Sequence, residues 1–273
     1  MSGAVDHIER HYAQSDLFEK IIEKLAQSGI EEAQITAQIL KPIDEFHIGG
    51  IAATKALLDP LGLTADTRLL DIGSGIGGTA RFIASEYGIK VVGIDLTPDF
   101  VTCAEKLSEI VGAKTSFEVG SGTQLPFADV SFDAATLIHV GMNIQDKDKL
   151  FAEAARVLTD GGVFAVYDVM LFGGQPEFPV PWATTAEDSF LGTPADYKTA
   201  AQKAGFTLEI RNDRGAFAKQ FFADMQAKIA ASGPPPVSLP MLMGDAAPNK
   251  MANMIGAVQA DHIQPVEMIF RKG

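Results

Sequence analysis

The sequence has very little cysteine: Cys103 is the only one in 273 residues. A single thiol cannot build a disulfide framework within one chain, and it cannot supply a thiolate metal cluster. Cys103 lies in a segment with a helical pattern of apolar residues, where a cysteine is typically an inert part of the core. The sequence also has no group of His, Asp and Glu at metal-ligand spacing, so it predicts no metal site.

Positive charge is scarce as well. The chain has 22 Lys and Arg against 35 Asp and Glu, which gives a net charge of -13 and a pI near 4.8. Binding to nucleic acid requires a basic surface that neutralises phosphates, and binding to an anionic membrane requires the same. The composition therefore disfavours both kinds of partner.

Long apolar runs are missing. No stretch of about 18 apolar residues occurs, so no membrane span is predicted. The first residues, "MSGAVDHIERHYAQSD", are polar and charged and contain no apolar signal segment. With 47% apolar residues overall, the chain is predicted to be a soluble cytoplasmic protein. Its oligomeric state is not specified by any of these features.

From residue 65 onward, short apolar runs alternate with helical patterns, which is typical of a parallel sheet with helices on both faces. We expect an α/β fold, a Rossmann-like and mainly parallel sheet of seven strands, with a helical cap. The expected units are an N-terminal helical cap at residues 1–64, a core at 65–214, a helical insert completing the cap at 215–261, and a last strand at 262–273.

Several boundaries follow from local signals. Asp16 is expected to cap an amphipathic helix that Gly29 ends. Residues 41–50, "KPIDEFHIGG", are expected to link this part to the core, and the final strand, "IQPVEMIFRK", is expected at an edge of the sheet. The loop at residues 172–190 is rich in proline and glycine and too long for an ordinary connection, so it is predicted to be functional.

The stretch "LLDIGSGIGG" places four glycines between a predicted strand and a helix. Gly73, Gly75 and Gly78 have the G-x-G-x-x-G spacing of a dinucleotide site. Asp71, however, stands at the end of the strand, where it would repel a pyrophosphate by a few kcal/mol at an effective dielectric near 20. It would attract a ligand with an ammonium group and a sulfonium, such as S-adenosyl-L-methionine.

Asp95 ends the next predicted strand, in "VVGIDLT", roughly twenty residues beyond the loop. A carboxylate there can accept hydrogen bonds from both ribose hydroxyls of an adenosine, so it suits either cofactor. The alternative is that Asp95 only caps the helix that begins at Pro98.

Together, "LLDIGSGIGG", "GID", "GSGTQLPF", "SFDAATLIHV" and "RVLTDGGVFAVYD" resemble the class I S-adenosylmethionine-dependent methyltransferases, in order and over residues 69–206. The segments "DEFHIGG", "HVGMNIQDK" and "PVPWA" are similar to the sarcosine/dimethylglycine N-methyltransferase branch that acts on small molecules. The resemblance implies S-adenosyl-L-methionine as cofactor and a small-molecule methyl acceptor.

Residue by residue, the resemblance places the glycine loop at the methionine part of the cofactor, Asp71 near its ammonium, Asp95 at the ribose and Leu96 under the adenine. The family usually has an aspartate where Ser121 stands, so the adenine contact departs from the pattern. The implied cofactor-binding residues are Asp71, Gly73, Ser74, Gly75, Gly77, Asp95, Leu96, Ser121, Gly122, Thr123 and His139.

Two histidines are catalytic candidates. His139 ends the fourth predicted strand beside the expected sulfonium, and its ordinary pKa suits proton removal near neutrality. The alternative is a histidine that only orients a loop through a backbone hydrogen bond. His47 in "DEFHIGG" is a second candidate, at the edge of the cap, and a local turn hydrogen bond is its alternative.

The acceptor pocket is expected to be formed by Tyr12, Phe46, Met142, Asn143, Asp168 and Trp182. Each of these has an ordinary structural alternative, as a hydrophobic anchor or a loop cap. A sarcosine-like acceptor would also need an arginine for its carboxylate, and Arg211 and Arg214 are the candidates for that role.

These features favour methyl transfer from S-adenosyl-L-methionine to nitrogen, oxygen or carbon of a small molecule, a small amine among the options. Two alternatives stay open: an NAD-dependent oxidoreductase, suggested by the glycine spacing, and a non-catalytic module that keeps the cofactor fold.

Overall fold

The structure is a computed structural model of the chain that describes residues 16–44, 47–233, 235, 237, 243–244 and 246–273. Seven strands form one sheet in the order β3-β2-β1-β4-β5-β7-β6. They are β1 (Arg68–Ile72), β2 (Lys90–Asp95), β3 (Thr115–Val119), β4 (Phe132–Ile138), β5 (Leu158–Leu171), β6 (Phe206–Asp213) and β7 (Ile263–Lys272). The strands from β1 to β5 pair in parallel, whereas β7 is antiparallel to both neighbours. The predicted seven-stranded, mainly parallel sheet is confirmed.

The position of the last strand differs from the expectation. β7 lies between β5 and β6, not at an edge, and β6 is the edge strand. The burial of side chains explains the arrangement: nearly all of β7 is buried, while β6 alternates between buried or half-buried and exposed positions. A run that is apolar on both faces except for the buried Glu267, such as "PVEMIF", is typical of a strand that is covered on both faces.

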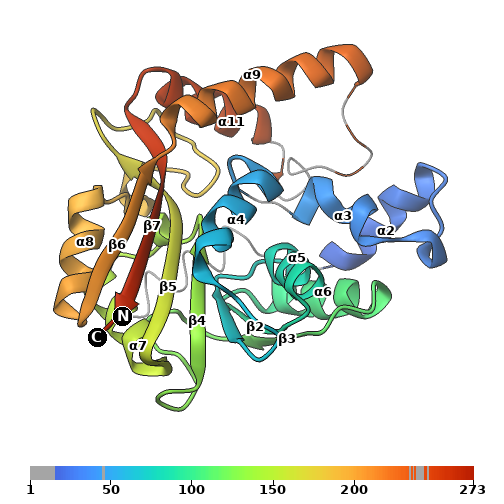
Figure 1. Cartoon of the computed structure of the whole chain (residues 1–273). Coiled ribbons are helices and arrows are strands. Elements are labelled where there is room, and N and C mark those ends of the chain that lie inside the picture. Colours follow the sequence, from blue (N-terminus) through green and yellow to red (C-terminus); the bar gives the residue numbers. More distant parts are fainter. Residues whose placement is uncertain (1–15, 45–46, 234, 236, 238–242, 245) are drawn as a thin grey trace.

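Helices cover both faces of the sheet (Figure 1). They are α2 (Leu17–Gln27), α3 (Ala37–Asp44), α4 (Gly50–Leu58), α5 (Gly78–Tyr87), α6 (Pro98–Ile110), α7 (Lys147–Val157), α8 (Pro194–Lys203), α9 (Gly215–Ser232) and α11 (Ala247–Gln259). Alternate residues of each strand point to opposite faces. Leu70 packs in the cluster that includes α7 and α8, and its neighbour Leu69 packs in the cluster that includes α5 and α6.

α4 packs on a face of the sheet against β5 and β7, whereas α2, α3, α9 and α11 lie toward the carboxyl ends of the parallel strands (Figure 1). α9 and α11 pack on each other above the sheet, and α2 and α3 lie beside them over α5 and α6 (Figure 1). This arrangement brings α2 and α3 to the same end of the molecule as α9 and α11 of the insert.

The helix ends that local sequence signals predict are only partly confirmed. Thr193 caps α8 with its side chain, and Pro194 begins the helix as expected. Asp16, by contrast, is left-handed and makes no side-chain cap. Part of the expected linker is helical, because α3 continues to Asp44 through Pro42.

No helix in the described part of the chain is long and apolar enough to cross a membrane. Cys103 is buried, and burial raises the pKa of its thiol to about 12, which fits an inert core position.

Candidate cofactor and acceptor site

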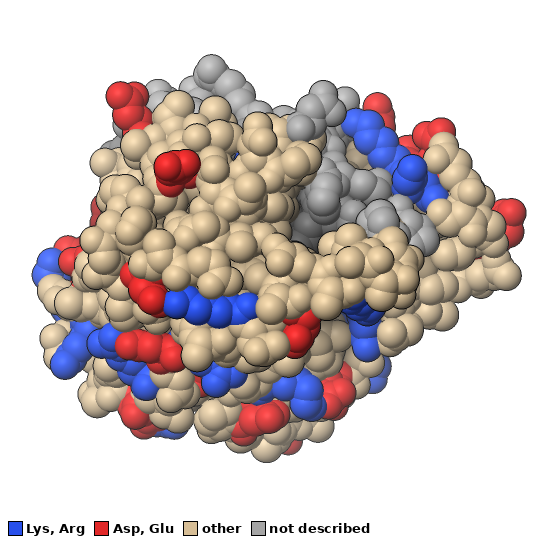
Figure 2. Space-filling model, turned by 90° about the horizontal axis from the view of Figure 1, so that it is seen from above, with Lys and Arg blue, Asp and Glu red and all other residues tan. Residues whose placement is uncertain are grey.

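A cavity of about 1820 Å³ opens at the carboxyl ends of the parallel strands, beneath the helices of the cap. One end is bordered by the loops after β1, β2 and β3, and the other by α9, α11 and the loop that carries Trp182. In the view from above, uncharged atoms cover most of the upper half of the described surface, and charged side chains are frequent in the lower half (Figure 2). Transfer of a group requires a donor and an acceptor that are bound next to each other, and a cavity with two distinct ends can hold both.

The four glycines after β1 have different tasks. Gly75 borders the cavity at φ +53, and no described atom lies within 4 Å of the place where its Cβ would be. Gly73 and Gly77 also have positive φ, and a Cβ on them would run into Val140 and Phe117. Gly78 allows the backbone of Asp44 to approach, because a Cβ there would collide with the carbonyl oxygen of Asp44. Gly75 is thus open to a ligand, whereas Gly77 is no part of the cavity wall among the described lining residues.

Asp71 is buried at the end of β1, behind the loop rather than on the cavity wall. One carboxylate oxygen accepts a hydrogen bond from Thr136 Oγ1 at 2.7 Å. The other, Oδ2, has no hydrogen-bond partner within the described ranges. Burial raises the pKa of this carboxyl to about 6, and the nearby charge of Asp95 adds to the effect. A cation on the other side of the loop would relieve this cost.

Asp95 borders the cavity at the end of β2. Its two oxygens accept hydrogen bonds from the backbone N–H groups of Gly75 and Thr97, each at 2.9 Å. Burial raises the pKa of Asp95. The carboxylate therefore fixes the glycine loop against β2, and each oxygen keeps further acceptor capacity for a ligand. It does not cap α6 in the usual way, because Thr97 is the N-cap residue.

Leu96, Ser121, Gly122 and Thr123 also border this end of the cavity. Ser121 Oγ lies 2.9 Å from Thr123 Oγ1 and accepts a hydrogen bond from the Thr123 backbone at 3.2 Å. Ser74 borders the cavity too, and its hydroxyl is buried with no partner in the described part of the chain. The residues that the sequence assigns to the adenosine thus border the same end of the cavity.

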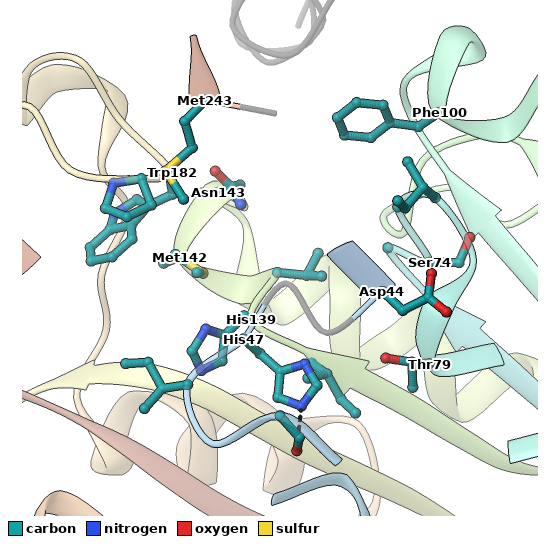
Figure 3. A pocket seen from close by; sticks show the side chains of 18 of the residues that line it. Asp44, His47, Ser74, Thr79, Phe100, His139, Met142, Asn143, Trp182 and Met243 are labelled. Atoms are coloured by element: carbon teal, nitrogen blue, oxygen red, sulfur yellow. Dashed lines mark hydrogen bonds between the residues drawn. The ribbon is translucent and has the colours of Figure 1, made fainter. Parts of the chain in front are cut away.

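His139 and His47 lie next to each other on the cavity wall (Figure 3), with their ring centroids 5.9 Å apart. His139 follows β4 with φ 53, and its ring stacks on Tyr167 at 5.4 Å. Its Nε2 is buried, and no described residue bonds to it. Burial, together with His47, holds the pKa of His139 well below its ordinary 6.5, so the imidazole is neutral at neutral pH.

His47 is held more tightly. Its Nε2 lies 3.1 Å from the Gly50 carbonyl and 2.9 Å from Thr54 Oγ1. Because a carbonyl only accepts, Nε2 carries the proton. Burial lowers the pKa of His47 to about 4. The local turn hydrogen bond that the sequence left open as an alternative is present, and it positions the ring beside His139.

The other end of the cavity contains Met142, Asn143 and Trp182, as expected for the acceptor pocket (Figure 3). Met142 and Asn143 lie on the short helix η3 (Gly141–Asn143) directly after His139. Trp182 donates its indole N–H to Ser189 Oγ at 3.0 Å. Tyr12 and Phe46 lie outside the described residues.

Asp168 does not reach the cavity, so its predicted contact with the acceptor is not supported. Its side chain is fully buried on the α8 side of the sheet, where it accepts a hydrogen bond from Tyr197 at 2.5 Å. Strand alternation is the reason: Tyr167 points toward His47, so the next side chain points to the opposite face. Arg211 and Arg214 are also off the described cavity wall; they face Asp213 and Glu267.

Sequence reasoning missed several residues of the site. Tyr167 supports His139, and its hydroxyl donates to the Ile48 carbonyl at 3.0 Å. The acceptor end is formed largely by residues of the insert: Phe221, Phe222, Met225, Met243, Met251, Met254 and Ile255. The density of methionine after residue 240 was a usable signal for this wall, because methionine is common at adaptable binding surfaces.

The chain is similar to known proteins in sequence and in fold. Residues 70–166 match the methyltransferase domain family. Phosphoethanolamine N-methyltransferase of Triticum aestivum is 32% identical over 184 residues, which cover 67% of this chain and 35% of that enzyme. The chain spans about a third of the length of the plant relatives that it matches.

Two solved structures share the fold. One is a Galdieria sulphuraria protein assigned as a sarcosine dimethylglycine methyltransferase, with TM-score 0.67, 21% identity and coverage of 82% of this chain and 86% of that one. The other is geranyl diphosphate C-methyltransferase of Streptomyces coelicolor, with TM-score 0.71, 16% identity and coverage of 100% and 98%. Residues 70–166 therefore match the methyltransferase domain family, and the chain shares its fold with these two methyltransferase structures.

Proposed function

We propose that this protein transfers a methyl group from S-adenosyl-L-methionine to a small-molecule acceptor. The observation that carries the proposal is the glycine loop, which borders a large cavity and covers Asp71, a buried carboxylate with a free oxygen in the described structure. The match of residues 70–166 to the methyltransferase domain family supports the same reaction.

The residues present fit this cofactor better than NAD. Asp71 and Asp95 are two carboxylates at the ends of adjacent strands, and burial raises the pKa of both. A pyrophosphate beside them would add negative charge, whereas an ammonium and a sulfonium would compensate it. Asp95 and Leu96 would hold the adenosine, with Ser121, Gly122 and Thr123 around the base.

Bound S-adenosyl-L-methionine supplies an electrophilic methyl group on a sulfonium. The chain has to align the acceptor and exclude water. His139 lies between the two ends of the cavity as a neutral imidazole, so it can accept the proton that the acceptor loses. His47 and Tyr167 hold the His139 ring in place from two sides.

The partners of the protein in this proposal are the cofactor and the acceptor. The net charge of -13 supports a protein that does not bind nucleic acid. A cytoplasmic location is part of the same proposal.

Titration calorimetry with S-adenosylmethionine, S-adenosylhomocysteine and NAD tests the cofactor. We expect binding of the first two and none of NAD; the reverse pattern would establish the oxidoreductase alternative. A screen for release of S-adenosylhomocysteine across amines, phenols and carbon acids tests the transfer. Cofactor binding with no release from any acceptor class would instead favour the non-catalytic module.

A further inference from the structure

The acceptor end of the cavity differs in chemistry from the cofactor end. Among the described residues, five methionines border the cavity: Met142, Met225, Met243, Met251 and Met254. Phe221, Phe222 and Trp182 stand among them. Since the Trp182 N–H is occupied by Ser189, only the apolar surface of the indole is available to a ligand. This wall buries apolar groups and can adapt to their shape.

Among the described residues, this wall has no buried cationic side chain that would bind an anion. No arginine borders the cavity among the described residues, and residues 215–261 contain none in the sequence. The lysines that border the cavity, Lys41, Lys149 and Lys228, are exposed to solvent. A carboxylate or phosphate bound beside the methionines would lose its hydration with no bidentate partner.

The volume of the cavity also favours a large acceptor. Its volume of about 1820 Å³ exceeds the range of roughly 300–1,000 Å³ that is usual for one small ligand. The cavity therefore has room for a cofactor and an acceptor considerably larger than sarcosine.

We infer that the acceptor is a bulky, uncharged and mainly apolar molecule, whose hydrocarbon part lies between α9, α11 and Trp182 and whose reacting group points toward His139 and Asn143. This inference rests on the proposed methyl transfer. It separates this chain from enzymes that hold small zwitterions or phosphate esters.

The test uses 4-alkylphenols from 4-ethylphenol to 4-hexylphenol, and the 4-hydroxyphenylalkanoic acids of matching length. Binding is measured by calorimetry at pH 8 on the full chain, with and without S-adenosylhomocysteine. Trp182 is the only tryptophan, so its fluorescence reports independently whether a probe enters the cavity.

We expect the affinity of the alkylphenols to rise about threefold to fourfold with each methylene, and each acid to bind at least tenfold more weakly than its matching phenol. The Trp182 signal should saturate at the same concentrations as the heat. A flat dependence on chain length, equal binding of the acids, or heat without a Trp182 signal would each overturn the inference.

Substitutions of the wall methionines test whether the probes bind at this wall. Met225 and Met251 are half-buried, so Met225→Gln and Met251→Gln keep side-chain length and replace the thioether with an amide. Each should weaken the hexyl probe about threefold to tenfold, while Met225→Leu and Met251→Leu should stay close to the parent. Circular dichroism checks the fold of all four.

If S-adenosylhomocysteine binds and the series fails, only the acceptor class is wrong. If S-adenosylhomocysteine does not bind, the proposed function fails, and the probe series still decides the chemistry of the wall.

Discussion

Asp71 carries a charge that is costly in the free protein. It is buried, only Thr136 donates to it among described side chains, and its second oxygen is left without a partner there. The raised pKa, about 6, expresses that cost. A cationic ligand would restore the ionised form, so binding and deprotonation are coupled.

For Asp71→Asn we expect S-adenosylmethionine to bind about tenfold more weakly at pH 8, because the compensating charge is gone. In the parent, affinity should fall as the pH drops from 7 to 5, since protonation through a pKa of about 6 removes the charge that attracts the ligand. Calorimetry across this range measures both effects. Parent and variant curves that stay parallel would contradict the assignment of Asp71.

Substitution of His139 is the most direct test of the proposed proton transfer. For His139→Gln we expect turnover to fall about a hundredfold or more, the range for loss of a general base, with the affinity for the cofactor changed less than about threefold. Because the pKa of His139 lies well below 6.5, turnover of the parent should not decline between pH 8 and 6.5 from protonation of this ring.

Steady-state kinetics with the best acceptor of the screen gives these values. His262→Gln is the matched control, since His262 is exposed and is not among the described cavity residues. Unchanged turnover of His139→Gln would leave His139 with a purely structural role.

At the scale of elements, the contact between α3 and α5 fixes the first half of the cap. The buried side chains of Arg81 and Asp44 form an ion pair, and Arg81 also donates to the Ile76 carbonyl at 2.8 Å. The backbone of Asp44 sits against Gly78 at the start of α5. Asp44 borders the cavity, so this contact sets the position of one wall.

For Gly78→Ala we expect a loss of about 1–3 kcal/mol in the free energy of unfolding, because the new methyl group must displace α3. Gly256→Ala is the control: Gly256 is exposed in α11 with no described atom near its would-be Cβ, so alanine should add up to about 1 kcal/mol. Urea denaturation measures both. Equal effects of the two substitutions would show that α3 does not depend on close approach at Gly78.

Strand alternation explains why some elements were predictable and some of their side chains were not. The strands themselves followed from short apolar runs, and β7 was found as a strand. Its place between β5 and β6 depends on pairing between segments far apart in sequence, which no local signal specifies. Asp168 was assigned to the site because it ends β5, yet its side chain points to the α8 face, toward Tyr197.

At the scale of the whole molecule, the cavity joins parts of the chain that are distant in sequence. His47 precedes α4, His139 follows β4, and Met225 and Met254 come from the insert. The buried groups of the cavity also make the stability of the fold depend on pH, because His47 must be deprotonated to occupy its buried position.

This requirement predicts a pH dependence of stability. His47 has a pKa of about 4 in the folded protein, below its ordinary 6.5. Between pH 6.5 and pH 4 the unfolded chain therefore binds more protons than the folded protein. As the pH falls through this range, the free energy of unfolding decreases. The free energy of unfolding of the parent relative to His47→Gln should therefore fall by on the order of 3 kcal/mol from pH 7 to 4.

Urea denaturation at several pH values gives this difference. The exposed His262→Gln should stay within about 0.5 kcal/mol of the parent throughout. A constant difference between the parent and His47→Gln would mean that burial of His47 does not depend on its proton.

The sequence by itself determined the class of fold and the cofactor wall, because the glycines, Asp71 and Asp95 are close together along two strands and the turns after them. Local spacing is enough to place such residues at one edge of a parallel sheet. The acceptor wall was decided only by the tertiary structure. Apart from Met142 and Trp182, its methionines and aromatic residues lie on helices more than a hundred positions away from the glycine loop, and only packing over the strand ends brings them to His139.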